Sequence, residues 1–365
     1  MKNTLKKGKR FFAVTLCILM ILSLCVPMSF AANGGVSINA GADALRAQFQ
    51  SGKGPKKDGY AIDYSYFSPV NGSGDDTKYP LVIFLPGWGE SHRPGEELTD
   101  NIACNWSSKE YQSRFSGTHG AYILIARARE DATLSWNSSL LTSPLKAALD
   151  DFVSKQSNVD TDRIYVLGWS YGGIGAINQA VSYPDFYAAA VFFAPPTAIS
   201  KADSIKLKNM SVWLDVCKSD SFANYNIHSE TSWNNIKNNT SNRSNIRITT
   251  YDKAPTTGGT LYNHNTWLDA LYDMNSNDSR YSGRKTIDGN GNSIDVGETG
   301  MISWLSAQKK THEPDVPETP DDSCNCNCHS TNGFTKLFWK IQVFFWKIFG
   351  MTSHRQCKCG EVSHW

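Results

Sequence analysis

The chain has 365 residues, of which 40% are hydrophobic and 19% are charged, and its formal net charge is +2. This length allows one large domain with an appendage, and the near-neutral charge gives no indication of a nucleic-acid partner. Five of the nine cysteines crowd into the C-terminal segment 324–365. The body of the chain is therefore expected to be held by a hydrophobic core rather than by a disulfide framework.

The N-terminus has the pattern of a secretory signal peptide. Five basic residues occur among the first ten, an apolar run extends from Phe11 to Val26, and a cleavage site for signal peptidase ends at Ala31. We expect removal of residues 1–31, a secreted protein, and a net charge of −3 after cleavage. The alternative is an uncleaved membrane anchor, although the apolar run is shorter than the ~20 residues that a spanning helix needs.

Residues 32–310 show the pattern of a doubly wound α/β domain with a mostly parallel sheet. Apolar, β-branched runs without alternation predict strands that are buried on both faces. These runs are Leu81–Leu85, Ala121–Ala126, Ile164–Leu167, Ala189–Ala194, Val212–Val216 and Ile246–Tyr251. Helices are predicted at Ser143–Gln156, Gly172–Ser182, Ser229–Asn238 and Met301–Lys309. Tyr60–Phe67 alternates more and is expected to be an antiparallel edge strand.

The segment Gly168-Trp-Ser170-Tyr-Gly172 has the pattern of a nucleophile elbow. A serine at the tip of a tight strand-to-helix turn sits in strained backbone, so the residues two positions away must lack side chains. Its hydroxyl lies close to a helix N-terminus, which favours developing negative charge. Because an apolar run precedes the motif and a helical pattern follows it, we predict that Ser170 is a catalytic nucleophile.

A nucleophilic serine needs a base that takes its proton, and the base needs a third group that orients it. In this fold the order along the chain is serine, acid, histidine. His264 follows the strand Ile246–Tyr251 and a Gly-containing loop, where a base can reach the elbow. His228 lies at an expected helix start, and His312 lies in a linker. We therefore predict that His264 is the base.

Three aspartates are candidates for the acid. Asp220 lies just past the strand Val212–Val216, at the carboxyl edge of the sheet where sites collect. Asp215 lies within that strand, and Asp252 lies just beyond the last parallel strand. Placement favours Asp220 and leaves the other two as alternatives.

The backbone N–H groups of Tyr171 and Trp88 are predicted to form the oxyanion hole. Tyr171 follows the nucleophile, and Trp88 lies in the Pro86-Gly-Trp-Gly-Glu90 loop after the strand Leu81–Leu85. Most of the eleven tryptophans are expected to fill the core. An aromatic cleft is nevertheless predicted, because ligand sites are commonly lined by aromatic side chains. The tryptophans predicted to line it are Trp136, Trp169 and Trp267.

Residues 274–300 are rich in Asn, Asp, Gly and Ser and predict a loop or hairpin insertion, with turn chemistry from Asp288 to Asn292. A calcium loop is the alternative, because oxygen-bearing side chains alternate there. However, Ser293 and Thr299 stand where such a loop has Gly and Glu. No metal is expected in this domain. Cys104 and Cys217 either pair or remain two buried thiols.

The C-terminal part is predicted to be a separate module. Residues 311–323 combine prolines with acidic residues and predict a semi-extended linker. Residues 324–365 are Cys-rich and contain the aromatic stretch Phe334–Phe349, whose lysines fall within a narrow arc of a helix. Such an amphipathic helix fits contact with a membrane surface, the cell wall or a protein partner.

The cysteines of this module leave two possibilities open. A structural zinc is one, and disulfides are the other, favoured by the C-x-C spacing and by an oxidising compartment. The residues concerned are Cys326, Cys328, Cys357 and Cys359. The tail is similar to Cys-rich C-terminal segments of secreted proteins from gut-dwelling Gram-positive bacteria. That resemblance implies retention at the cell surface.

The motifs of the body resemble those of secreted α/β-hydrolases of the feruloyl/acetylxylan-esterase and polyhydroxybutyrate-depolymerase type. The resemblance covers roughly residues 58–310 and includes the Pro86–Glu90 loop, the segment 159–173 and His264-Asn-Thr-Trp267. It implies a Ser170–Asp220–His264 triad without a cofactor, acting on esters of carbohydrate or phenolic polymers. Two features depart from the family: many relatives have histidine at the position of Pro86, and residues 274–300 exceed the usual length.

These patterns leave three functions open. The first is a secreted serine esterase that acts on acyl, feruloyl or acetyl esters of plant polysaccharide. The second is a serine peptidase or a polyester depolymerase, which the elbow cannot distinguish from the first because acyl transfer chemistry is shared. The third is an inactive hydrolase-fold protein that binds a surface, against which the complete Ser-Asp-His set argues.

Overall fold

The computed structural model describes residues 42–69, 76–88, 103–128, 134–253, 263–267 and 283–310. The chain divides into two compact units, 1–310 and 311–365, and the described residues all belong to the first. The predicted signal peptide (1–31), linker (311–323) and Cys-rich module (324–365), with its zinc or disulfide cysteines, lie outside the described residues.

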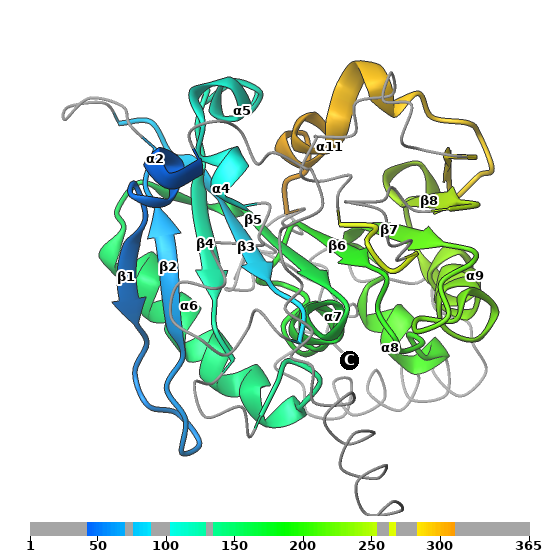
Figure 1. The fold of residues 1–365 in the computed structure, drawn as a ribbon, viewed down its shortest axis with the longest axis horizontal. Coiled ribbons are helices and arrows are strands. Elements are labelled where there is room, and N and C mark those ends of the chain that lie inside the picture. Colours follow the sequence, from blue (N-terminus) through cyan, green and yellow to red (C-terminus); the bar gives the residue numbers. More distant parts are fainter. Residues whose placement is uncertain are drawn as a thin grey trace, which may run out of the picture. The chain divides into compact units, whose positions relative to one another are not determined.

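A nine-stranded mixed sheet forms the centre of the first unit, in the order β1-β2-β4-β3-β5-β6-β7-β8-β9 (Figure 1). The strands from β4 to β8 in this order run parallel, and the pairs β1/β2, β2/β4 and β8/β9 are antiparallel. The predicted mostly parallel α/β fold is confirmed. The bounds are β1 (Gln50–Lys53), β2 (Asp63–Phe67), β3 (Tyr79–Leu85), β4 (Tyr122–Ala126), β5 (Val159–Trp169), β6 (Ala189–Phe193), β7 (Ser211–Cys217), β8 (Arg247–Tyr251) and β9 (Lys285–Asp288).

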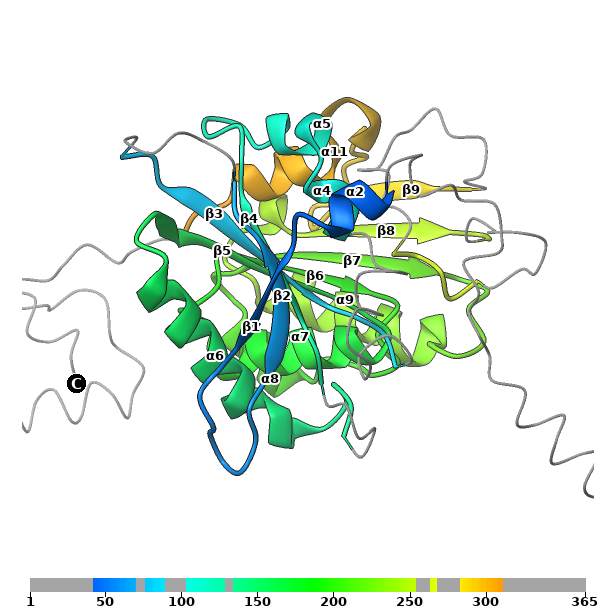
Figure 2. The ribbon, with the colours of Figure 1, turned by 60° about the vertical axis from the view of Figure 1, so that its left-hand side comes forward.

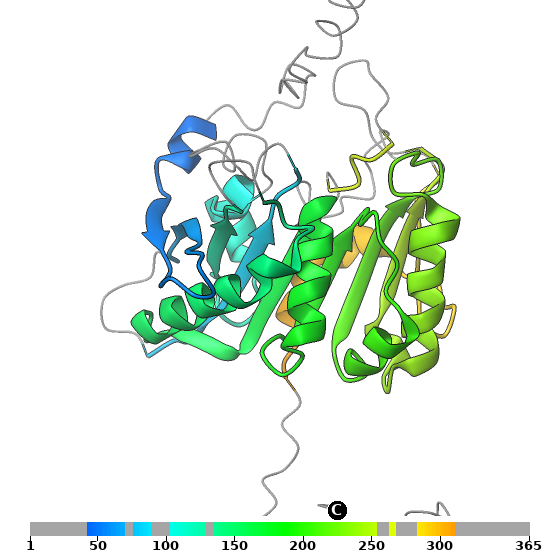
Figure 3. The ribbon, with the colours of Figure 1, turned by 90° about the horizontal axis from the view of Figure 1, so that it is seen from below.

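Helices cover both faces of the sheet (Figure 2). On one face, also seen in Figure 3, lie α6 (Thr142–Lys155), α7 (Tyr171–Ser182), α8 (Lys201–Lys206) and α9 (Glu230–Asn239). On the other face lie α2 (Ala42–Arg46), α4 (Ala103–Trp106), α5 (Lys109–Ser113) and α11 (Val296–Ser306).

The alternation of side chains along β3 explains why both faces are covered. Ile83 packs in the core cluster that includes residues of α6, α7 and α9. Its neighbours Val82 and Phe84 pack in the opposite cluster, with residues of α4, α5 and α11. All seven residues of β3 are buried, as expected for a strand between two helical layers.

The edges of the sheet are two short strands, β1 and β9, of which the sequence did not predict β1. β1 covers β2, so Tyr60–Phe67 contains an antiparallel strand that is not the edge of the sheet. β9 lies inside the segment 274–300, which was predicted as a loop or hairpin insertion, and pairs with β8. Both strands are four residues long and mostly polar. Short edge strands lack the continuous apolar signal of buried ones.

The residues after β9 form the turn that the sequence predicts. One carboxylate oxygen of Asp288 accepts hydrogen bonds from the backbone N–H groups of Asn290 and Asn292, each at 2.9 Å. The other oxygen accepts from the Asn292 side-chain amide at 2.9 Å. Within the described ranges, no group of three or more His, Cys, Asp or Glu side chains is arranged to hold a metal.

The two cysteines of the body are buried thiols that are not joined to each other. Cys104 lies in α4 and Cys217 ends β7. The thiol of Cys217 lies 3.3 Å from the Ser219 hydroxyl oxygen. The second of the two predicted alternatives therefore holds. As for membrane association, none of the helices among the described residues has the length and apolarity needed to cross a bilayer.

Candidate active site

Ser170 occupies the sharp turn between β5 and α7. Its backbone has φ 56° and ψ −119°, a conformation that costs energy for a residue with a side chain. The turn is fixed on both sides: the N–H of Ser170 donates to the carbonyl of Phe193 in β6 (2.9 Å), and its own carbonyl accepts from the N–H of Ile174 (3.2 Å). Strain that is held in place in this way is typical of functional sites.

Two glycines make this turn possible because other backbone occupies the space of their missing side chains. A Cβ on Gly168 would overlap the carbonyl of Gly172. A Cβ on Gly172 would overlap the carbonyl of Leu85, and it would also meet the carbonyl of Pro86 at 2.5 Å. The first turn of α7 thus lies directly against the loop after β3.

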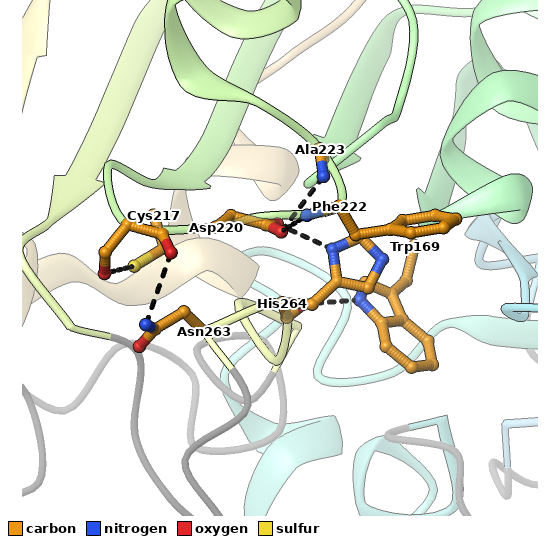
Figure 4. A network of polar contacts seen from close by, with 8 residues as sticks. Trp169, Cys217, Asp220, Phe222, Ala223, Asn263 and His264 are labelled. Carbon is orange, nitrogen blue, oxygen red and sulfur yellow. Dashed lines mark hydrogen bonds and ion pairs between the residues drawn. The ribbon is translucent and has the colours of Figure 1, made fainter.

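Asp220 and His264 contact each other at the carboxyl edge of the sheet (Figure 4). The imidazole Nδ1 lies 2.6 Å from Asp220 Oδ2, and both side chains are buried. The other carboxylate oxygen of Asp220 accepts from the backbone N–H groups of Phe222 (2.8 Å) and Ala223 (3.0 Å). Because a carboxylate only accepts, Nδ1 carries the proton, and in the neutral imidazole Nε2 is then the nitrogen with the lone pair.

The alternative acids have other surroundings. Asp215 is buried within β7 and accepts a hydrogen bond from the Tyr251 hydroxyl at 3.3 Å. Asp252 is exposed and forms an ion pair with Lys218 at 3.3 Å. Of the three candidates, Asp220 contacts His264. Of the other two histidines considered, His228 lies in a π-helix (Tyr225–Ser229), and His312 lies outside the described residues.

The predicted oxyanion-hole residues lie on two segments that touch. Tyr171 is the first residue of α7, and the first N–H groups of a helix have no acceptor within the helix. Trp88 ends the described part of the loop after β3, which contacts the start of α7 at Gly172. The Trp88 side chain is 61% exposed. This placement leaves both backbone N–H groups as candidates for the hole.

Two aromatic rings lie close to the imidazole of His264. The rings of Trp169 and Phe222 lie with their centroids 5.5 and 5.1 Å from it. Trp267 lies 5.5 Å from Trp169, and Tyr171 lies 6.2 Å from Phe222. Phe222 is 50% exposed, and sequence reasoning missed it. Its signal was an aromatic residue two positions after the acid.

Trp136 is a correction to the predicted cleft. Its side chain is 1% exposed and belongs to the core cluster beneath α6 and α7, where its Cβ would touch a side chain added at Gly175. Large aromatic residues fill core volume more often than they line a site. Trp136 is therefore a core residue rather than a substrate contact.

Comparison with known proteins finds ester hydrolases. A family model described as "PETase: PET hydrolase-like" matches residues 134–293, less than half of the chain. This range includes Ser170, Asp220 and His264. The search of the curated proteins found no match.

Among solved structures, one described as "Crystal Structure of a Thermostable Esterase" is similar in fold, with a TM-score of 0.56 and 22% sequence identity. The match covers 73% of this chain and 64% of that one, so the chain spans less than two thirds of the esterase's length. In all, 1046 chains of solved structures match. Because so widespread a fold hosts many activities, the function must be argued from the site.

Proposed function

We propose that the protein is a serine hydrolase that cleaves carboxylic esters through an acyl-enzyme on Ser170. The observation that carries this proposal is the buried Asp220–His264 hydrogen bond (2.6 Å). Trp169, which precedes Ser170 in the strained elbow, joins this pair to the elbow by donating to the His264 carbonyl at 2.8 Å. A neutral imidazole whose Nδ1–H is held by a carboxylate is the base that a serine nucleophile requires. The matches to a PET hydrolase-like family model and to an esterase fold support the same chemistry.

In the proposed reaction, the Ser170 hydroxyl attacks the ester carbonyl carbon while His264 Nε2 takes its proton. The negative charge on the carbonyl oxygen is stabilised by the N–H groups of Tyr171 and Trp88. His264 then gives the proton to the leaving alcohol, and the carbon–oxygen bond to that alcohol breaks. A water molecule, deprotonated by His264, then attacks the acyl carbon; the bond from that carbon to the Ser170 oxygen breaks, and His264 returns the proton to this oxygen. Asp220 stays ionised and orients the imidazole throughout.

For the substrate, we propose esters with an aromatic acyl group. The exposed ring of Phe222 lies 5.1 Å from the imidazole of His264, and the ring of Tyr171 lies 6.2 Å from Phe222. Aromatic side chains pack well against planar rings. Feruloyl esters of plant polysaccharide and terephthaloyl polyesters share such an acyl group. The PET hydrolase-like match favours the polyester, whereas the resemblance of the motifs favours the feruloyl ester.

We also propose that the protein is exported. The basis is the N-terminal pattern of residues 1–31, and the Cys-rich C-terminal module would retain the enzyme at the cell surface. Detection of mature protein that begins at Ala32 in the culture fluid or on the cell wall would support this proposal.

A substrate panel tests the proposed function. Wild-type protein is expected to hydrolyse p-nitrophenyl acetate, and to hydrolyse methyl ferulate and bis(2-hydroxyethyl) terephthalate with a higher kcat/KM than acetylated xylan. The physical reason is the additional contact between aromatic rings at the site, typically worth about 0.5–1.5 kcal/mol, or roughly 2- to 12-fold. Initial rates followed by absorbance or by chromatography of the released acid give the comparison. Cleavage of a peptide substrate without ester hydrolysis would contradict the proposal.

A further inference from the structure

Among the hydrogen bonds that hold the short segment 263–267, which carries His264, three join it to the acid loop and the elbow within the described residues (Figure 4). Two come from the acid loop: Asp220 accepts from the imidazole at 2.6 Å, and the carbonyl of Ser219 accepts from the Asn263 side-chain amide at 3.3 Å. The third comes from the elbow. The indole Nε1–H of Trp169 donates to the backbone carbonyl of His264 at 2.8 Å.

We propose that Trp169 is a positioning residue, whose indole N–H fixes the backbone of His264 relative to Ser170. Trp169 directly precedes Ser170 in the chain, and the elbow is rigid because its backbone is bonded to β6 and crowded by the loop after β3. The hydrogen bond from Trp169 therefore fixes the position of the base, His264, relative to the nucleophile, Ser170. This inference rests on the proposed function and adds to it a link between the two reacting groups.

The surroundings of the indole favour this role over substrate contact. Its ring is partly buried against the core cluster of the α11 face, and its centroid lies 5.5 Å from the imidazole of His264 and 5.5 Å from the ring of Trp267. Its one hydrogen-bond donor is already used by the His264 carbonyl. An indole has no other polar group to offer a substrate.

Replacing the indole by a phenyl ring distinguishes a role in positioning His264 from a role in contact with the substrate. Trp169→Phe is expected to lower kcat by about 10-fold with KM little changed, because loss of one hydrogen bond and a small displacement of the base act on the chemical step. The loss should be equal for p-nitrophenyl acetate and p-nitrophenyl benzoate, since positioning does not depend on the acyl group. A rise in KM confined to the benzoate ester would assign Trp169 to the substrate site and overturn the proposal.

Trp136→Phe is the matched control. It makes the same change in a core tryptophan whose Nε1 has no hydrogen-bond partner among the described residues, so kcat is expected to stay within about twofold. Thermal unfolding of both variants checks that they are folded. If Trp169→Phe is unstable, β-(3-benzothienyl)alanine at position 169 keeps the ring size and removes only the N–H. Unchanged kcat in that variant would overturn the inference.

A spectroscopic measurement keeps this inference separate from the proposed function. The proton between His264 Nδ1 and Asp220 should give a low-field proton NMR signal in the wild type, because short hydrogen bonds to charged acceptors deshield the proton. We expect the signal to broaden or shift in the benzothienylalanine variant and to remain in Trp136→Phe. A wild type that shows this behaviour without ester hydrolysis would refute the proposed function and leave the positioning role intact. An unchanged signal in the position-169 variant would refute the positioning role.

Discussion

Ser170→Ala is expected to lower kcat for p-nitrophenyl acetate by about 10⁶-fold, the size of effect seen when a serine nucleophile is removed from an assembled triad. The change deletes one oxygen atom and leaves the elbow otherwise intact, because alanine tolerates φ 56° no worse than serine does. Without that oxygen no acyl bond can form at position 170, and the proposed oxyanion hole alone would remain. Stopped assays at high enzyme concentration measure the residual rate.

Ser204→Ala is the control for this variant. Ser204 is a buried serine in α8 whose hydroxyl donates to the backbone carbonyl of Lys201 at 2.8 Å. The same atom is deleted there, outside the site, so activity should match the wild type. Full activity in Ser170→Ala would mean that hydrolysis occurs elsewhere on the protein. Absence of ester hydrolysis by both the wild type and the variant would favour an inactive, surface-binding protein.

Asp220→Asn is expected to lower kcat by about 10⁴-fold, as for a triad whose acid becomes an amide. The structure shows why this change affects the bond to His264 and leaves the rest of the turn in place. Asp220 Oδ1 accepts from the N–H groups of Phe222 and Ala223, and an asparagine oxygen would keep these bonds. The amide NH₂ would then face His264 Nδ1 and donate to it. The imidazole would have to carry its proton on Nε2, where it cannot accept the serine proton.

Asp252→Asn distinguishes this role from a general effect of lost charge. Asp252 was the other loop acid that placement allowed, and its exposed carboxylate pairs with Lys218. Exposed ion pairs contribute little, so kcat should change by less than about threefold. A large loss in Asp252→Asn together with an active Asp220→Asn would reassign the acid.

The parallel strands could be predicted because burial on both faces makes them continuous apolar runs. Position at the carboxyl ends of those strands then singled out Asp220 and His264, which the structure brings into contact. Phe222 could not be predicted in the same way. Its exposed position next to the imidazole depends on the turn that Asp220 closes through its hydrogen bonds to the backbone. Such a turn leaves no periodic pattern in the sequence.

The tryptophans show that residue type alone cannot distinguish a core residue from a site residue. Trp136 and Trp169 are the same residue type near the same helix, yet one lies in the core and the other donates a hydrogen bond to His264. Only packing in three dimensions separates them. The polar edge strand β1 was missed for a related reason, since pairing with a neighbouring strand, rather than a pattern of its own, makes it a strand.

Trapping the acyl-enzyme tests the central claim most directly. Wild-type protein mixed with p-nitrophenyl benzoate, quenched in acid within milliseconds and digested, should carry one benzoyl group on the peptide that contains Ser170, detected by mass spectrometry. Accumulation of this species is the kinetic mark of nucleophilic catalysis. Turnover of the ester without any benzoylated peptide, or with the group attached to another residue, would contradict the account.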